Sequence, residues 1–110
     1  APEDMKVHLR AKGVEVYEFE QPTPVETMKV LYDKGCLTVL WECGGKLASE
    51  AVKHNCVQKV VAFVAPKLIG GSKYSPLASI GVQDMSQAIE LRDVEVDVLG
   101  NKDVMITGYI

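Results

Sequence analysis

Apolar side chains in the middle of the chain change from one spacing to another within a few residues. Residues 37–41 form a short apolar run rich in strand-forming side chains, closed by an acid, a cysteine and the pair Gly44-Gly45. From residue 46 to residue 53 the apolar positions follow a helical period, with polar side chains on the opposite side. The pattern predicts a buried strand that runs through two glycines directly into an amphipathic helix.

Two further helices are predicted before this unit. Residues 2–12 carry charges around a few apolar side chains and end at Gly13, which is typical of a short surface helix. The second helix has Thr23 as N-cap, Pro24 at its first position, Glu26 completing a capping box, and a glycine just past its end. Its inner face is expected to lie in the core and consists of Val25, Met28, Leu31 and Tyr32.

The other strands are expected to be of two types. Residues 14–19 alternate between apolar and polar side chains, which predicts a short strand. Residues 59–68 are apolar without alternation, as in a strand covered on both faces. In residues 94–98 valines alternate strictly with acids, and residues 100–102 are typical of a turn. Residues 104–110 alternate again, so the segment is predicted to be an antiparallel hairpin with one solvent-exposed face.

The predicted order is β-α-β-α-β followed by a hairpin, which favours an α/β fold with an open, mostly parallel sheet flanked by helices and an antiparallel edge. Ligands in such sheets bind beyond the carboxyl ends of strands, where residues 42–45 fall. Unpaired N–H groups at the helix start suit a phosphate. Alternatively, the glycines only permit a tight turn, and the full G-x-G-x-x-G fingerprint is missing. Residues 69–76 form a turn-rich loop, either a ligand lid or a connection.

Composition narrows the classes of function. The 110 residues are 47% hydrophobic and 25% charged, as expected for one globular domain. The net charge of −3 provides no basic field for a polyanion, so nucleic-acid binding is not expected. Apolar runs are too short to span a membrane and the N-terminal segment has no signal-peptide pattern, so we expect a soluble protein without membrane association.

Cysteine and histidine spacing gives no support for a metal site. Cys36, Cys43 and Cys56 are odd in number and lack C-x-x-C spacing, which argues against both a disulfide framework and a zinc site. His8 and His54 are far apart and lie in no ligand pattern. We therefore predict free thiols in a reducing, intracellular compartment.

Three motifs in order resemble one known family. Residues 42–48 (ECGGKLA), 65–71 (APKLIGG) and 103–109 (DVMITGY) resemble the reductase domain of the bacterial and plant riboflavin-biosynthesis deaminase/reductase family. The resemblance extends over nearly the whole chain and implies a dihydrofolate-reductase-like fold. It also implies NADPH-dependent reduction of the ribosyl group of 5-amino-6-(5-phosphoribosylamino)uracil, or its undeaminated counterpart, to the ribityl form. Dihydrofolate reductase itself is disfavoured because the first two motifs belong to the riboflavin branch.

The resemblance also implies roles for individual residues, though no catalytic proton donor is evident among them. Glu42 would contact the pyrimidine substrate, whose N–H groups a carboxylate can accept as hydrogen bonds. Cys43 stands where many members have glycine, and either plain packing or a redox role is compatible with it. The NADPH phosphates would be held by Gly44, Gly45, Lys46, Leu47, Ala48 and Ser49.

Length is the main departure from the family. Its reductase domain is about twice as long, so residues 1–110 are expected to be the C-terminal half, a partial domain lacking a central strand between residues 37–41 and 59–65. Pairing with the rest of the parent protein or formation of a homodimer would cover the gap. The resemblance places the protein in the plastid stroma for a plant source and in the cytoplasm otherwise. A non-catalytic nucleotide-binding or assembly module that retains part of the fold is the alternative function.

Overall fold

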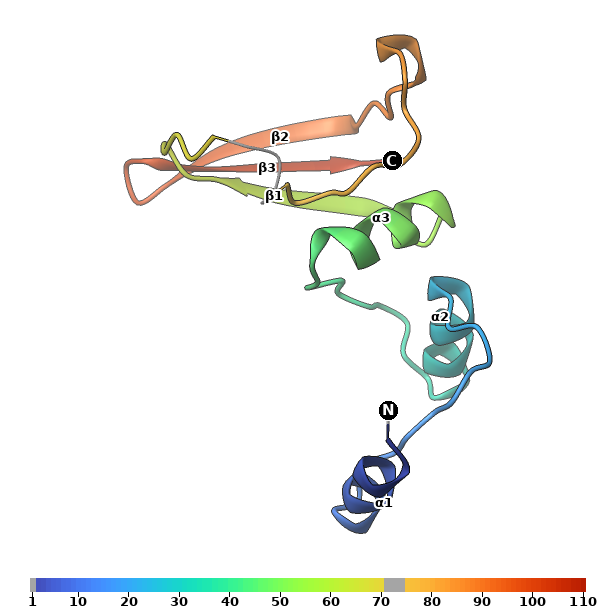
Figure 1. Ribbon diagram of the computed structural model, residues 1–110. Coiled ribbons are helices and arrows are strands. Elements are labelled where there is room, and N and C mark those ends of the chain that lie inside the picture. The colour runs from blue at the N-terminus through green and yellow to red at the C-terminus, as the bar shows by residue number, and fades with distance from the viewer. Residues whose placement is uncertain (1, 71–74) are drawn as a thin grey trace.

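The computed structural model describes residues 2–70 and 75–110, so part of the predicted loop at residues 69–76 lies outside the described residues. Three helices precede the first strand, and a hairpin closes the chain (Figure 1). The elements are α1 (Glu3–Ala11), α2 (Pro24–Asp33), α3 (Gly45–Lys53), β1 (Lys59–Val64), the short 3-10 helix η1 (Met85–Gln87), β2 (Arg92–Leu99) and β3 (Asp103–Tyr109). The chain is thus a small α/β structure whose three helices are confirmed.

Local capping explains where α2 begins and ends. The Thr23 hydroxyl accepts a hydrogen bond from the Glu26 amide at 3.2 Å, and the Glu26 carboxylate accepts one from the Thr23 amide at 3.2 Å. Both halves of the predicted capping box are therefore present. The helix ends before Gly35, whose φ of 86° is a left-handed conformation that glycine adopts without strain.

Residues 14–19 do not form the predicted strand. Instead, ion pairs with the neighbouring helices hold this segment: Lys6 and Arg10 of α1 bind Glu18, and Lys34 after α2 binds Glu15. The hydrogen bond from Lys6 lowers the pKa of Glu18, and that from Lys34 lowers the pKa of Glu15. An alternating sequence becomes a strand only beside another strand, and none of the described strands lies next to this segment.

Residues 37–41 are also not a strand, although their apolar run predicts a buried one. Leu37 is 89% exposed and Leu40 is 83% exposed. One contact fixes the segment to the chain after α3, because the Trp41 indole donates a hydrogen bond to the Cys56 carbonyl at 3.3 Å. The prediction is wrong for this chain because a strand requires a ladder partner, and among the described residues none pairs with this segment.

The sheet has the order β1-β3-β2 and its three strands are all antiparallel. The predicted hairpin is confirmed, and Leu99 pairs with Asp103 across a loop of residues 100–102. Gly100 and Asn101 have positive φ angles of 57° and 69°, as the central residues of a type I′ turn require, and the Lys102 amide donates the closing hydrogen bond to the Leu99 carbonyl at 3.2 Å. The mostly parallel sheet predicted from the sequence is not present among the described strands. β1 pairs on one edge only and much of it is exposed, so it is not covered on both faces as predicted.

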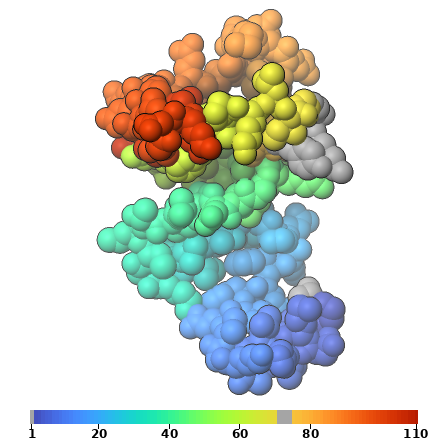
Figure 2. Space-filling model, turned by 90° about the vertical axis from the view of Figure 1, so that its left-hand side faces the viewer, coloured from blue at the N-terminus to red at the C-terminus, as the bar shows by residue number. Residues whose placement is uncertain are grey.

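The described chain buries very little of its apolar surface. Ala51 is the one core hydrophobic residue among the described residues, and Tyr32, predicted in the core, is 70% exposed. The radius of gyration is 17.4 Å, whereas about 13 Å is expected for a compact chain of this length. Figures 1 and 2 show the reason: α1 and α2 extend away from the sheet, with α3 between them and the strands.

Removing the α2 cap should destabilise the chain. Thr23→Ala is expected to lower the free energy of unfolding by about 1 kcal/mol, because the Glu26 amide loses its acceptor. Urea unfolding followed by far-ultraviolet circular dichroism measures the change. Thr38→Ala, at an exposed position outside the helices and strands, is the matched control. Equal effects of the two substitutions would contradict a capping role for Thr23.

Candidate functional site

The predicted turn into α3 is present. Gly44 is the N-cap residue, with extended backbone angles (φ −74°, ψ 161°), and its carbonyl accepts the first helical hydrogen bond from Ala48 at 3.1 Å. This helix has neither a side-chain cap nor an acid in its first turn. The first amides of the helix and the positive end of its dipole therefore meet no negative side chain from the helix itself, which is the electrostatic arrangement that a phosphate requires.

Gly44 and Gly45 have different surroundings. A Cβ atom at Gly44 would meet nothing within 4 Å. At Gly45 it would lie 2.8 Å from the Ser75 carbonyl oxygen, closer than real Cβ atoms pack, and 3.2 Å from that of Pro76, a tight contact. The Ala78 amide also donates a hydrogen bond to the Gly45 carbonyl at 3.1 Å. Residues 75–78 therefore cross directly over Gly45, and this crossing is what excludes a side chain there.

Ser49 points into the structure. It is 1% exposed, and its hydroxyl donates a hydrogen bond to the Gly45 carbonyl at 2.6 Å. The same carbonyl thus receives hydrogen bonds from Ser49 and from the crossing segment at Ala78. Ser49 and Gly45 together fix residues 75–78 to the first turn of α3. This contact could not be predicted from the sequence, since nothing in a local pattern relates residue 45 to residue 78.

The remaining predicted site residues divide by exposure. Glu42, Gly44, Lys46 and Leu47 are exposed, whereas Ala48 is half-buried. The structure thus brings the Glu42 carboxylate, the exposed backbone of Gly44 and the Lys46 ammonium to the N-terminal end of α3. Cys43 is half-buried, and all three cysteines are free thiols.

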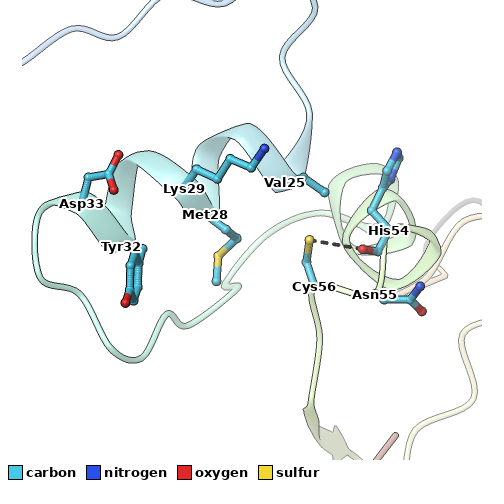
Figure 3. A pocket seen from close by; sticks show the side chains of 8 residues that line it. All are labelled: Val25, Met28, Lys29, Tyr32, Asp33, His54, Asn55 and Cys56. Atoms are coloured by element: carbon cyan, nitrogen blue, oxygen red, sulfur yellow. Dashed lines mark hydrogen bonds between the residues drawn. The ribbon is translucent and has the colours of Figure 1, made fainter.

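A groove of about 570 Å³ lies between α2 and the end of α3, away from this turn. Its lining consists of Val25, Met28, Lys29, Tyr32, Asp33, His54, Asn55 and Cys56 (Figure 3). The apolar part of the lining belongs to the face of α2 predicted to lie in the core. A smaller groove, of about 290 Å³, lies between residues 15–19 and α2. We interpret the first groove as an apolar helix face without cover, because it contains none of the predicted site residues.

No group of three or more metal-ligating side chains occurs among residues 2–70 and 75–110. In the same part of the chain, none of the helices has the length and apolar character needed to cross a membrane.

Comparison with known proteins relates the chain to plant and cyanobacterial sequences. It is 47% identical over 103 residues to the riboflavin biosynthesis protein PYRR, chloroplastic, of Arabidopsis thaliana, a match that covers 93% of this chain and 17% of the relative. It is 47% identical over 104 residues to the riboflavin biosynthesis protein RibD of Synechocystis, a match that covers 94% of this chain and 28% of that protein. The riboflavin biosynthesis protein PYRR, chloroplastic, of Zea mays is 43% identical over 111 residues, a match that covers 100% of this chain and 18% of that protein.

The chain therefore spans less than a third of the length of each of these relatives. A family model described as the RibD C-terminal domain matches residues 1–105, and the chain belongs to that family.

Proposed function

We propose that this chain is part of an enzyme of riboflavin biosynthesis that reduces the ribosyl group of a ribosylamino-pyrimidine phosphate to the ribityl form with NADPH. The observation that carries the proposal is its 47% identity, over more than nine-tenths of its length, to two proteins named for riboflavin biosynthesis. The reductase step itself rests on the motifs at residues 42–48 and 65–71. A plastid location follows from the chloroplastic relatives if the source is a plant.

The N-terminal turn of α3 is suited to the phosphates of the cofactor at some of the predicted positions. Gly44 leaves open space beside the first helical amides, and Lys46, the second residue of α3, is an exposed cation in the same turn. Gly45 and Ser49 fit less well, because the crossing segment and the helix backbone already engage them. NADPH would supply the hydride, while this chain would bind and orient its phosphates through Gly44 and Lys46.

Glu42 is the residue we propose for substrate recognition. It is exposed and lies two residues before the N-cap of α3. A carboxylate in that position can accept hydrogen bonds from pyrimidine N–H groups while the neighbouring amides bind phosphate, so both ligands would meet at one turn. This juxtaposition allows one short segment to align substrate and cofactor.

The rest of the parent protein is proposed to complete the domain. Leu37 and Leu40 are apolar and exposed, and none of the described strands pairs with residues 37–41. In the same part of the chain, β1 has one edge without a strand partner. A strand inserted between them would satisfy both sets of backbone groups and cover Leu37 and Leu40. In this arrangement residues 1–110 form the C-terminal half of a mostly parallel, dihydrofolate-reductase-like sheet, and substrate contacts from the other half are supplied in the parent.

Gly44→Val is expected to abolish NADPH binding in the parent protein. A Cβ atom at this position meets nothing within 4 Å, so the substitution should leave folding intact while filling the space that the phosphates need. Isothermal titration with NADPH, together with thermal unfolding, measures both effects.

The matched control is Gly45→Val, which should lower the melting temperature because its Cβ atom meets the Ser75 carbonyl at 2.8 Å. Unchanged NADPH affinity in a folded Gly44→Val protein would exclude this turn as the phosphate site.

Glu42→Gln should impair substrate use far more than it changes NADPH affinity. Loss of a charge-assisted hydrogen bond costs roughly 1.5–3 kcal/mol, which corresponds to roughly a tenfold to hundredfold decrease in kcat/KM for the pyrimidine. Steady-state kinetics of the parent protein measure the change, with Glu50→Gln on the exposed side of α3 as the control. If Glu42→Gln lowers only the melting temperature, the carboxylate serves the fold and not the substrate.

The 110 residues alone are expected to have no reductase activity. Positioning of cofactor and substrate is most of what the protein contributes, and half of the contacts are absent. NADPH oxidation in the presence of the ribosylamino-pyrimidine phosphate measures this, with the parent protein as the positive control. Turnover at the rate of the parent would contradict the half-domain assignment, and an inactive parent would favour a non-catalytic assembly module.

A further inference from the structure

Ser49 is a buried polar side chain in the middle of α3. It is 1% exposed, and the other buried polar side chain of the described residues is Thr107, at 6%. Serine forms helices less readily than alanine, and in the interior its hydroxyl needs a partner. Here the partner is the Gly45 carbonyl, one turn earlier, at 2.6 Å. Alanine would suit the helix at least as well, so the reason for serine lies in what its hydroxyl holds.

The Gly45 carbonyl accepts hydrogen bonds from two side contacts. One comes from the Ser49 hydroxyl, and the other comes from the Ala78 amide at 3.1 Å. Glycine has no Cβ atom, so local sterics restrict its backbone less than that of any other residue. The two hydrogen bonds therefore do much of the work of fixing the orientation of this peptide group.

The same peptide group carries the Lys46 amide. A trans peptide is planar, so its N–H points away from its C=O and turns with it. Helical carbonyls point toward the C-terminal end, and the amides point toward the N-terminal end. Lys46 is the second residue of α3, and its amide is one of the first, which have no acceptor within the helix. Fixing the Gly45 carbonyl thus also fixes a donor at the open end of the helix.

The direction of this donor matters for an anion at the turn. A hydrogen bond weakens steeply as it bends, and a donor that is already aligned needs no reorganisation when the anion binds. The glycines that leave room for a phosphate also leave the backbone free to rotate. Ser49 and Ala78 restrain it from one side and leave the space beside Gly44 open.

We propose that Ser49 is a positioning residue for the cofactor: through the Gly45 carbonyl, its hydroxyl aligns the Lys46 amide toward the NADPH phosphates. The inference rests on the proposed function, because it takes the N-terminal turn of α3 as the phosphate site. It assigns Ser49 a role without contact with the cofactor, in keeping with its burial.

Replacing the hydroxyl in the parent protein tests the proposal. Ser49→Ala should raise the dissociation constant for NADPH about two- to tenfold, the range that corresponds to one hydrogen bond. Ser49→Cys keeps a weak donor and should give an intermediate value. Isothermal titration measures both. Steady-state kinetics should show a higher KM for NADPH with little change in kcat, because Ser49 does not touch the reacting atoms.

Thermal unfolding shows whether each variant is folded at the titration temperature. Helix preference decreases in the order Ala, Ser, Cys, whereas donor strength decreases in the order Ser, Cys, Ala. A loss of affinity in the second order supports the proposal. Thr107→Val, which removes the other buried hydroxyl, is the matched control and should leave NADPH affinity unchanged. Equal losses in Ser49→Ala and Thr107→Val would overturn the positioning role.

Gly44→Val distinguishes failure of this inference from failure of the proposed function. If Gly44→Val abolishes NADPH binding while Ser49→Ala leaves the affinity unchanged, the turn is the phosphate site and the positioning role alone is overturned. If Gly44→Val leaves the affinity unchanged, the phosphate site lies elsewhere and the inference is overturned with it.

Discussion

Too few elements pack against one another in this chain to bury its apolar side chains. Each helix and strand presents one apolar face, and a stable domain buries these faces against each other. Here α3 has the fully buried Ala51, while Leu37, Phe63 and Leu68 are largely exposed. The helices and the hairpin are complete because their hydrogen bonds close within short stretches of chain. What the chain does not supply by itself is the second layer that would hold them together.

This constraint explains which elements could be predicted from the sequence. The capping box at Thr23 and the turn at Gly100-Asn101 depend on residues close in sequence, and both are present. The strands expected at residues 14–19 and 37–41 depend on distant partners. Their alternating or apolar patterns describe what each segment would bury. Ion pairs hold the first segment, and the second is held by a hydrogen bond from the Trp41 indole to the Cys56 carbonyl.

The candidate site divides in the same way. Periodicity and a glycine pair located the turn and the start of α3, because both signals lie within ten residues. These signals could not show that Gly44 and Gly45 have different surroundings. Only the crossing of residues 75–78 does so, since it brings the Ser75 carbonyl and the Ala78 amide onto Gly45 and leaves Gly44 open. The inward orientation of Ser49 has the same origin, because its hydroxyl bonds to the carbonyl that receives the crossing segment.

The geometry of this crossing restricts how any phosphate can approach the turn. One side of the first helical turn is closed by backbone from residues 75–78, which a side-chain rotation cannot move. The open side carries Gly44 and is flanked in sequence by the carboxylate of Glu42 and the ammonium of Lys46. A phosphate on that side gains the helix dipole and Lys46 but approaches Glu42, a repulsion that falls if the carboxylate is engaged by substrate N–H groups. Substrate and cofactor would then favour each other's binding through a single side chain, a coupling that a neutral amide at residue 42 removes.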